Sequence, residues 1–328
     1  MSLRIRKNGI LDTIQDGGRY GYQHLGINPA GAMDITAMKI ANILVGNEAG
    51  EAVIEMHFPA AEILFEETML VALSGADFTA TINGDTVPIL QPLIVQQGST
   101  LRFDKNITGA RVYLAVQGGY LTKEWLQSSS THLKVEAGGF EGRALQKNDL
   151  LLLKQNLISQ VVTHVKPVVI LSWRVNVSDL YVSNTFHFIP GAEYYGLNES
   201  SKQQLEAGSF AINQQSDRMG YRLSGVPLQL QIEKELISTA VTKGTIQLLP
   251  DGQLIILMAD HQTTGGYPRI GHVISADISS LAQMQARQIF ALKKIDISSA
   301  ENLLFDQQRN LQQLQNACNL RLQEYFKT

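Results

Sequence analysis

Five hydrogen-bonding side chains occupy the consecutive positions 260–264, directly after the apolar run 254–257. A carboxylate such as Asp260 at the end of a buried strand can act as a general base, and Gln or Thr side chains can hold an amide or a carboxylate. The Gly-Gly pair at 265–266 can present backbone amides to an anion. The same residue types also form ordinary polar turns, so the stretch is either the lip of a site or a surface loop.

Two further stretches combine acidic side chains, arginines and glycines. Asp16 and Arg19 flank two glycines that allow a tight turn and the close approach of a ligand. Asp217, Arg218 and Arg222 surround a Gly-Tyr pair. A guanidinium can clamp a carboxylate or a phosphate through two charge-assisted hydrogen bonds, but an Asp–Arg pair can equally staple a turn. Both stretches therefore remain open between an anion site and a structural ion pair.

Several classes of chemistry lack their motifs in this sequence. The chain has no Walker-type phosphate loop and no G-x-S-x-G elbow. Its seven histidines do not pair at metal-ligand spacing, and the single Cys318 excludes an internal disulfide and a cysteine-based metal cluster. We therefore expect no metal. The run Ser-Ser-Ser-Thr at 128–131 could be a cluster of nucleophiles or a polar loop.

Composition and charge describe an ordinary globular protein. The 328 residues are 44% hydrophobic and 17% charged, with a net charge of -3, so nucleic acid is not an expected partner. No apolar run reaches the roughly 20 residues of a membrane helix, and the charged N-terminus lacks the apolar segment of a signal peptide. We expect a cytoplasmic protein with no membrane partner.

Lys39 follows Ala-Met, as the modified lysine does in biotinylated carrier proteins. Such a lysine needs an exposed hairpin tip, whereas Lys39 lies inside a predicted helix. We therefore expect no biotin attached to this chain.

Short strands make up most of the predicted secondary structure. Asn83 and Gly84 favour a hairpin turn between two of them, because both residues tolerate positive φ. The pattern predicts a mainly β protein built of barrels or sandwiches. Alternating or β-rich runs occur at 3–6, 69–73, 78–82, 112–116, 150–153, 168–171, 185–189 and 254–257.

Three helices are predicted among and after the strands. Asp34 can cap a helix whose apolar positions recur as far as Val45, and Gly46 can end it. A second, shorter helix is predicted at 281–286. In a third, at 300–326, the apolar positions form one face that packs on its own domain or on a partner helix. That face comprises Leu304, Leu311, Leu314, Cys318, Leu322 and Tyr325.

Three regions follow from these patterns. We predict an N-terminal β lobe at 1–160, a C-terminal β lobe at 161–298 and a helical tail at 299–328. The stretches 15–26 and 215–225 share Gln, Asp, Arg, Gly-Tyr and a final Gly. This echo suggests two related lobes without establishing a repeat.

The motifs resemble those of the allophanate hydrolase subunit 2 family, also called the biotin-dependent carboxyltransferase family. Its best-defined bacterial members are the C subunits of ATP-dependent 5-oxoprolinases. The matching blocks run in family order from about residue 10 to 295 and leave only the Gln-rich tail outside. They include "TIQDGGRYGYQHLGINPAGAMD" (13–34), "LSGADFTATING" (73–84), "RVYLAVQGGY" (111–120), "SDRMGYRLSG" (216–225) and "GTIQLLPDGQLIILMADHQTTGGYPRIGHVISAD" (244–277).

The resemblance implies two cyclophilin-like β-barrel lobes with a few short helices and a C-terminal helix. It also implies a role as the C subunit of a 5-oxoprolinase that opens 5-oxo-L-proline to L-glutamate and consumes ATP, in complex with A-like and B-like subunits. Two alternatives remain. The chain could be a biotin-dependent carboxyltransferase acting on urea or another amide. It could instead be a regulatory protein that antagonises a kinase inhibitor similar to the B-like subunits.

The resemblance also suggests which residues bind the small amide substrate. Asp260, Asp217 and Asp16 are the candidate catalytic residues. Either Arg222 or Arg218 would hold the substrate carboxylate. The remaining candidate binding residues are Arg19, Asn42, Asp34, Gln262, Thr263, Thr264, Gly265, Gly266 and Tyr267.

Some positions depart from the family pattern. Residues 127–131 read Gln-Ser-Ser-Ser-Thr where Gly-Ser-Arg-Ser-Thr is usual, and His261 stands where arginine is common. A lost arginine could change which anion is held, so these departures bear on substrate identity more than on the fold.

Overall fold

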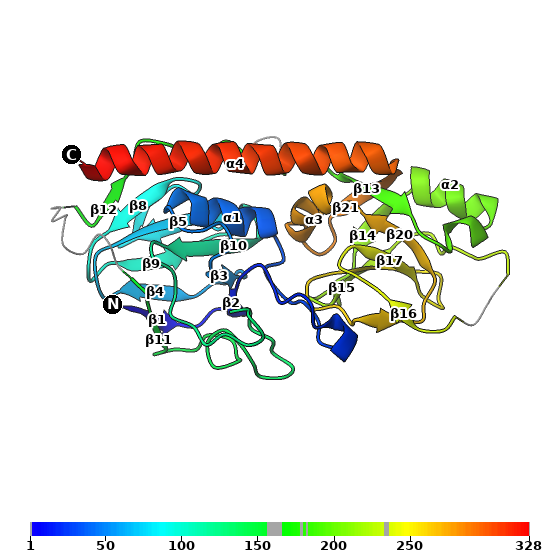
Figure 1. Ribbon diagram of the computed structural model, residues 1–328, viewed down its shortest axis with the longest axis horizontal. Coiled ribbons are helices and arrows are strands. Elements are labelled where there is room, and N and C mark those ends of the chain that lie inside the picture. Colours follow the sequence, from blue (N-terminus) through cyan, green and yellow to red (C-terminus); the bar gives the residue numbers. More distant parts are fainter. Residues whose placement is uncertain (1, 156–165, 178–179, 182, 233–235, 328) are drawn as a thin grey trace. The chain divides into compact units, whose positions relative to one another are not determined.

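The structure is a computed structural model that describes residues 2–155, 166–177, 180–181, 183–232 and 236–327 (Figure 1). Its residues group into two compact units. Unit 1 comprises Met1–Arg19, Asp34–Val177 and Arg309–Thr328, and unit 2 comprises Tyr20–Met33 and Ser178–Gln308. The predicted boundary between residues 160 and 161 lies outside the described residues.

Unit 1 is a double-layered β structure around one apolar core. One sheet has the order β11-β1-β4-β9-β6-β7 and the other β12-β8-β5-β10-β3-β2. Apolar residues of both sheets, such as Ile5, Phe65, Leu73 and Leu114, form one buried cluster. The strands are β1 (Ser2–Lys7), β2 (Asp12–Gln15), β3 (Val53–Met56), β4 (Glu62–Phe65), β5 (Met69–Asp77), β6 (Ala80–Ile82), β7 (Asp85–Thr86), β8 (Pro92–Val95), β9 (Thr100–Phe103), β10 (Thr108–Val116), β11 (Leu150–Leu152) and β12 (Val168–Ile170).

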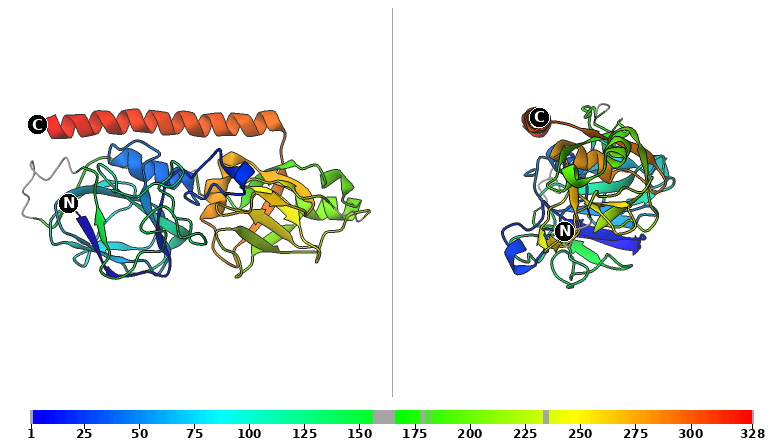
Figure 2. Two further views of the ribbon diagram at one scale, coloured as in Figure 1. Left: turned by 60° about the horizontal axis from the view of Figure 1, so that its bottom comes forward. Right: turned by 90° about the vertical axis from the view of Figure 1, so that its right-hand side faces the viewer.

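Unit 2 is a closed seven-stranded barrel in the order β13-β20-β17-β18-β15-β14-β21, with a small β16-β19 ladder. Figure 2 shows the strands of each unit curving around that unit's own interior. The strands are β13 (Thr185–Pro190), β14 (Ser209–Ile212), β15 (Gly220–Ser224), β16 (Thr239–Ala240), β17 (Thr245–Leu248), β18 (Leu254–Leu257), β19 (Thr264–Gly265), β20 (Arg269–Val273) and β21 (Ile289–Lys294). The mainly β prediction is confirmed.

The predicted helix after Asp34 is confirmed as α1 (Ile35–Leu44) in unit 1. The Asp34 carboxylate accepts a hydrogen bond from Ala37 N at 2.8 Å, a cap that contributes about 1 kcal/mol. Gly46 has φ of 77°, a left-handed value that favours glycine after a helix. A Cβ at Gly46 would lie 2.8 Å from Leu322 Cδ1, so the position needs glycine for its space as well.

Two other local predictions meet different outcomes. The hairpin turn is confirmed, because Asn83 and Gly84 link β6 to β7 with φ values of 54° and 96°. The short helix predicted at 281–286 is wrong. Helix α3 instead spans Ser275–Ala282, with Asp277 in its first turn. The two serines before Leu281 are interior residues of this helix and not its start.

The predicted C-terminal helix is confirmed as α4 (Ile297–Lys327), drawn in red in Figure 1. Cys318 and Leu322 on its predicted apolar face are buried. The Tyr325 ring packs edge-on against Trp173 of the same unit at 6.4 Å between centroids. Shorter elements complete unit 2, namely η1 (Gln23–Leu25), η2 (Tyr194–Gly196) and α2 (Glu199–Ala207).

Asp12 in β2 gives the fold of unit 1 a specific pH dependence. Its side chain is 1% exposed, and burial raises the pKa of its carboxyl group from 3.8 to about 7. A folded-state pKa above the unfolded value means that ionisation opposes folding. Stability from this group is therefore fully present below pH 4 and is lost as the pH rises to about 7.

We expect Asp12→Asn to remove this loss of stability at high pH, because an amide does not ionise. In the parent chain Gly9 N donates to Asp12 Oδ2 at 3.0 Å, and the amide oxygen of asparagine can accept the same hydrogen bond. At about 1.4 kcal/mol for each pKa unit, the variant should be more stable than the parent by about 2–4 kcal/mol at pH 8 and similar to it at pH 4. Urea unfolding at both pH values measures the difference. An equal effect at both pH values would contradict the assignment.

Candidate functional site

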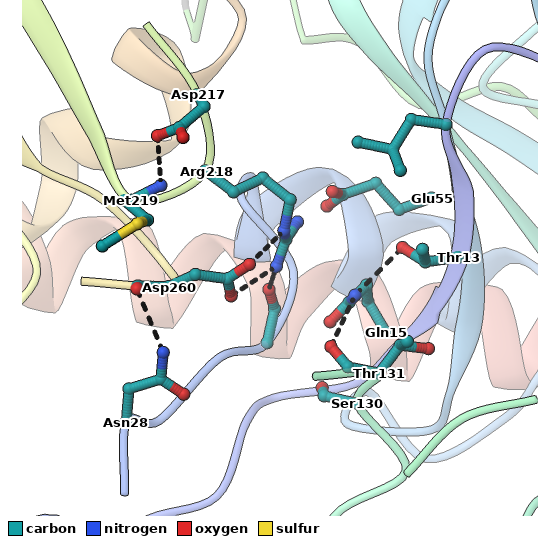
Figure 3. Close-up of polar contacts among 12 residues, drawn as sticks. Thr13, Gln15, Asn28, Glu55, Ser130, Thr131, Asp217, Arg218, Met219 and Asp260 are labelled. Carbon is teal, nitrogen blue, oxygen red and sulfur yellow. Dashed lines mark hydrogen bonds and ion pairs between the residues drawn. The ribbon is translucent and has the colours of Figure 1, made fainter. Parts of the chain in front are cut away.

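Asp260 and Arg218 form a paired contact inside unit 2. Asp260 Oδ2 accepts from Arg218 Nε at 2.8 Å, and Oδ1 accepts from Nη2 at 3.1 Å. Figure 3 shows the guanidinium lying along the carboxylate. Arg218 Nη2 also donates to Gly31 O at 2.7 Å, and Asn28 Nδ2 donates to Asp260 O at 3.0 Å. The pair therefore anchors the segment Tyr20–Met33 to the barrel.

Asp217 shapes the turn that precedes β15. Its Oδ1 accepts hydrogen bonds from Met219 N at 2.8 Å and Gly220 N at 3.3 Å. This arrangement fixes the turn, as Asp side chains commonly do. The Asp217 side chain stays at the surface of unit 2, where it lines a cavity.

This cavity of about 700 Å³ lies against the outer face of the unit 2 barrel. Strand alternation explains its lining, since successive side chains point to opposite faces. Ile246, Leu248, Leu254 and Ile256 fill the barrel core, so their neighbours face outward. The outward and loop residues that line the cavity include Arg222, Gln247, Ile255, Gln262, Tyr267 and Asp251.

The cavity brings together some of the predicted site residues and excludes others. Asp217, Arg222, Gln262 and Tyr267 line it. Arg218 is engaged by Asp260, so of the two candidate arginines only Arg222 lies at the cavity. Gln247 was not predicted, although a single glutamine between apolar neighbours in "TIQLL" is the kind of alternation that marks an outward position.

The glycines and threonines after Asp260 contribute mainly backbone hydrogen bonds to the fold of unit 2. Thr263 O accepts from Val241 N at 3.1 Å. Thr264 and Gly265 form β19 and pair with Ala240 and Thr239. Gly266 lines a second cavity of about 920 Å³ in unit 2, which shares Tyr267 with the first. The stretch 258–270 is thus a structured connection whose exposed side chains reach a cavity.

Asp16 is the centre of a polar network in unit 1. Its carboxylate accepts from Ser128 Oγ at 2.7 Å, from Ser129 N at 2.6 Å and from Gly18 N at 2.8 Å, and also from Ser130 Oγ. Residues 128–131 are buried and lie outside the helices and long strands. The serines therefore hold the Asp16 loop, which supports the loop interpretation of this run.

The other predicted N-terminal residues also make contacts within unit 1. Arg19 is 1% exposed, donates to Ser130 O and stacks over Trp125 at 4.7 Å. Asn42 in α1 donates to Glu51 O at 2.7 Å. Asp34 caps α1. These contacts position the backbone of unit 1.

Two buried groups of unit 1 were missed by the sequence patterns. Glu55 is fully buried in β3 and accepts from Tyr113 OH at 2.9 Å. Desolvation raises the pKa of Tyr113 well above its ordinary value. Gln15, labelled in Figure 3, donates to Thr13 Oγ1 at 3.0 Å. Glu55 lies among apolar residues in β3, where a lone polar residue gives little sequence signal, and Gln15 ends the strand Asp-Thr-Ile-Gln, whose polar residues do not mark it as buried.

His261 and His272 of unit 2 favour their neutral forms. Burial lowers the pKa of both imidazoles, and His261 Nδ1 makes a 2.6 Å contact with Gln262 O. Among the residues that the structure describes, no group of three His, Cys, Asp or Glu side chains could hold a metal ion. No helix in the same residues is long and apolar enough to cross a membrane.

The fold and its motifs place the chain in a defined family. Residues 25–294 match the family described as carboxyltransferase domain, subdomain A and B, and the chain belongs to this family. It is 35% identical to the C subunit of 5-oxoprolinase from Escherichia coli (strain K12) over 312 residues, which cover 95% of this chain and 97% of that protein. It is 33% identical to the C subunit of 5-oxoprolinase from Haemophilus influenzae over 291 residues, 89% of this chain and 90% of that protein.

Other relatives share part of their length with this chain. Urea amidolyase of Saccharomyces cerevisiae is 35% identical over 156 residues, 47% of this chain and 8% of that protein. The crystal structure of the K. lactis urea amidolyase superimposes with a TM-score of 0.86 at 23% identity, covering 95% of this chain and 20% of that one. The structure of TTHA0988 gives 0.74 at 27% identity, covering 90% and 55%. These likenesses confirm the fold.

Proposed function

We propose that the chain is the C subunit of an ATP-dependent 5-oxoprolinase, which opens 5-oxo-L-proline to L-glutamate together with A-like and B-like subunits. The similarity to the C subunit of the E. coli 5-oxoprolinase over nearly the whole of both chains carries this proposal. A polar cavity on the unit 2 barrel, with one arginine and three glutamines among the residues that line it, supports the proposal.

The reaction needs ATP because a lactam is a poor electrophile. Transfer of the γ-phosphoryl group to the lactam oxygen releases ADP and activates the ring carbon. Water then adds to that carbon, and breaking the C–N bond leaves an acyl phosphate on the opened chain. A second water releases phosphate and L-glutamate. ATP is thus a cosubstrate of the complex, and stabilisation of the oxygen-centred charge is the task of the assembled site.

The lining of the unit 2 cavity fits a carboxylated amide. Arg222 supplies a cation that suits a carboxylate, and glutamine amides can both donate to a carbonyl oxygen and accept from an N–H group. Within this proposal the cavity binds the substrate, and Asp260 with Arg218 maintains the connection that forms one side of the cavity.

The test is reconstitution of the complex. We expect glutamate from 5-oxo-L-proline and ATP only when this chain is mixed with its A-like and B-like partners, and no glutamate when any one of the three is omitted. Coupled detection of ADP and amino-acid analysis measure both products. Equal turnover without this chain would overturn the proposal.

A carboxyltransferase acting on urea or another amide is the second candidate, favoured by the 35% identity to yeast urea amidolyase. That similarity covers 47% of this chain. Carboxylation of urea by this chain with a carboxylated biotin carrier, in place of glutamate formation, would establish it.

A further inference from the structure

Three neighbouring strands of the unit 2 barrel carry one row of outward side chains. Gln247 of β17 pairs in register with Ile255 of β18, and Ile255 pairs with Arg222 of β15. With strands about 4.8 Å apart, the Gln247 and Arg222 backbones are roughly 10 Å apart on either side of Ile255. All three residues line the 700 Å³ cavity.

The middle of this row is apolar and has little side-chain bulk above the barrel. Gly220 also lines the cavity, and a Cβ there would lie 2.8 Å from Ile255 Cδ1. The missing side chain therefore lets Ile255 lie flat between the two polar ends. A ring about the size of a five-membered lactam can rest on such a surface while its polar groups reach outward.

Gln247 presents a buried amide at one end of the row. The residue is 0% exposed, and its Oε1 accepts from Gln262 Nε2 at 3.4 Å. Its Nε2 has no hydrogen-bond partner among the described residues. A buried N–H group without an acceptor is unfavourable, so an acceptor supplied by a ligand would remove an existing penalty.

Gly265 packs closely against this amide. A Cβ at Gly265 would lie 2.6 Å from Gln247 Nε2, so any larger residue would displace the amide or cover it. Gly265 does not have positive φ, so its backbone conformation does not require glycine. The close approach to Gln247 Nε2 requires it instead.

Arg222 presents a guanidinium at the other end. Its side chain is exposed and forms no ion pair with the residues that the structure describes. Two carboxylates, Asp217 and Asp251, also line the cavity. These charges favour a ligand with a single carboxylate and an otherwise neutral body. The carboxylate can bind Arg222, whereas a second negative charge would be repelled by Asp217 and Asp251.

We infer that Gln247 is a specificity-determining residue that donates from Nε2 to the carbonyl oxygen of a compact, singly anionic amide whose carboxylate binds Arg222. The identity of the ligand as 5-oxo-L-proline rests on the proposed function. The binding arrangement itself rests on the cavity, the register and the buried amide.

The test compares two probes that differ at the ring amide. 5-Oxo-L-proline has the ring carbonyl, whereas cyclopentanecarboxylate keeps the ring and the carboxylate but lacks the amide. Binding to the full-length chain is measured by calorimetry. We expect Gln247→Met to weaken 5-oxo-L-proline about tenfold and to change cyclopentanecarboxylate less than about twofold, whereas Arg222→Met weakens both.

Gln229→Met is the matched control, because Gln229 lines the second cavity and not the first. It should leave both probes unchanged. Gln247→Met should also keep or raise the melting temperature of the unliganded chain, since it removes a buried donor that has no acceptor among the described residues. Gln247→Glu provides a second variant of nearly equal size if the first does not fold.

The outcomes separate this inference from the proposed function. Equal weakening of both probes by Gln247→Met, or no binding of either probe to the parent chain, overturns the inference. Absence of glutamate from the complete wild-type complex overturns the proposed function. Selective loss of 5-oxo-L-proline binding in the Gln247 variant supports the inference even when the complex shows no turnover.

Discussion

Replacing Arg222 with methionine is expected to lower kcat/KM for 5-oxo-L-proline about a hundredfold in the reconstituted complex. Arg222 is the arginine that lines the 700 Å³ cavity of unit 2. A charge-assisted hydrogen bond to a carboxylate is among the stronger polar contacts. Most of the loss should appear as a higher KM, because a carboxylate remote from the reacting carbon is bound in the ground state and the transition state alike.

Stability should change little in this variant. The Arg222 side chain is exposed, and surface substitutions usually alter the free energy of unfolding by less than about 0.5 kcal/mol. Arg321→Met provides the control, since Arg321 is an exposed arginine on α4 whose ion pair with Glu324 is also exposed. Unchanged kinetics with Arg222→Met would remove the residue from substrate binding, whereas Arg222→Lys tests how much of the effect needs the planar fork.

Asp260→Asn is expected to lower the free energy of unfolding by about 3–5 kcal/mol, the usual cost of breaking a buried ion pair by removing one partner. The Arg218 side chain is only 7% exposed and the Asp260 side chain 19%. The variant leaves the guanidinium buried beside a neutral amide. Urea unfolding of the full chain measures the loss.

The double variant Arg218→Met/Asp260→Leu tests the same pair from the other direction. It should recover much of the lost stability, because replacing a buried pair by apolar side chains is often neutral. An acid–base role for Asp260 would show differently. In that case Asp260→Asn would also lose kcat in enzyme that is still folded, and the acid limb of the pH–rate profile would disappear. The observed ion pair leads us to expect the stability loss.

Local features of the fold could be predicted because their determinants are adjacent in sequence. The Asp34 cap and Gly46 stop of α1 lie at its two ends, and the Asn83-Gly84 turn needs only two residues that tolerate positive φ. The long C-terminal helix carries its own apolar periodicity. The start of α3 was mispredicted because Ile274, its N-cap residue, makes no side-chain capping bond, so the sequence holds no cap signal there.

The cavity was only partly predictable because its members come together through strand register. Arg222, Gln262 and Tyr267 lie in motifs rich in polar residues, which made them visible. Gln247 is one polar residue inside an apolar strand, and only its pairing with Ile255 places it in the same row as Arg222. The partners of Asp16 and Asp260 likewise lie 112 and 42 residues away.

Each unit is built from segments that are far apart in the chain, and this constrains how the chain can fold during synthesis. Tyr20–Met33 belong to unit 2 although the rest of that unit starts at Ser178, and Arg309–Thr328 belong to unit 1 although they follow every strand of both units. Unit 1 therefore cannot be completed as it leaves the ribosome, because Leu322 and Tyr325 must still reach Gly46 and Trp173. The apolar surface of unit 1 that packs against the last helix stays exposed until that helix has been synthesised. We therefore expect chaperones to bind nascent chains that are stalled before residue 309.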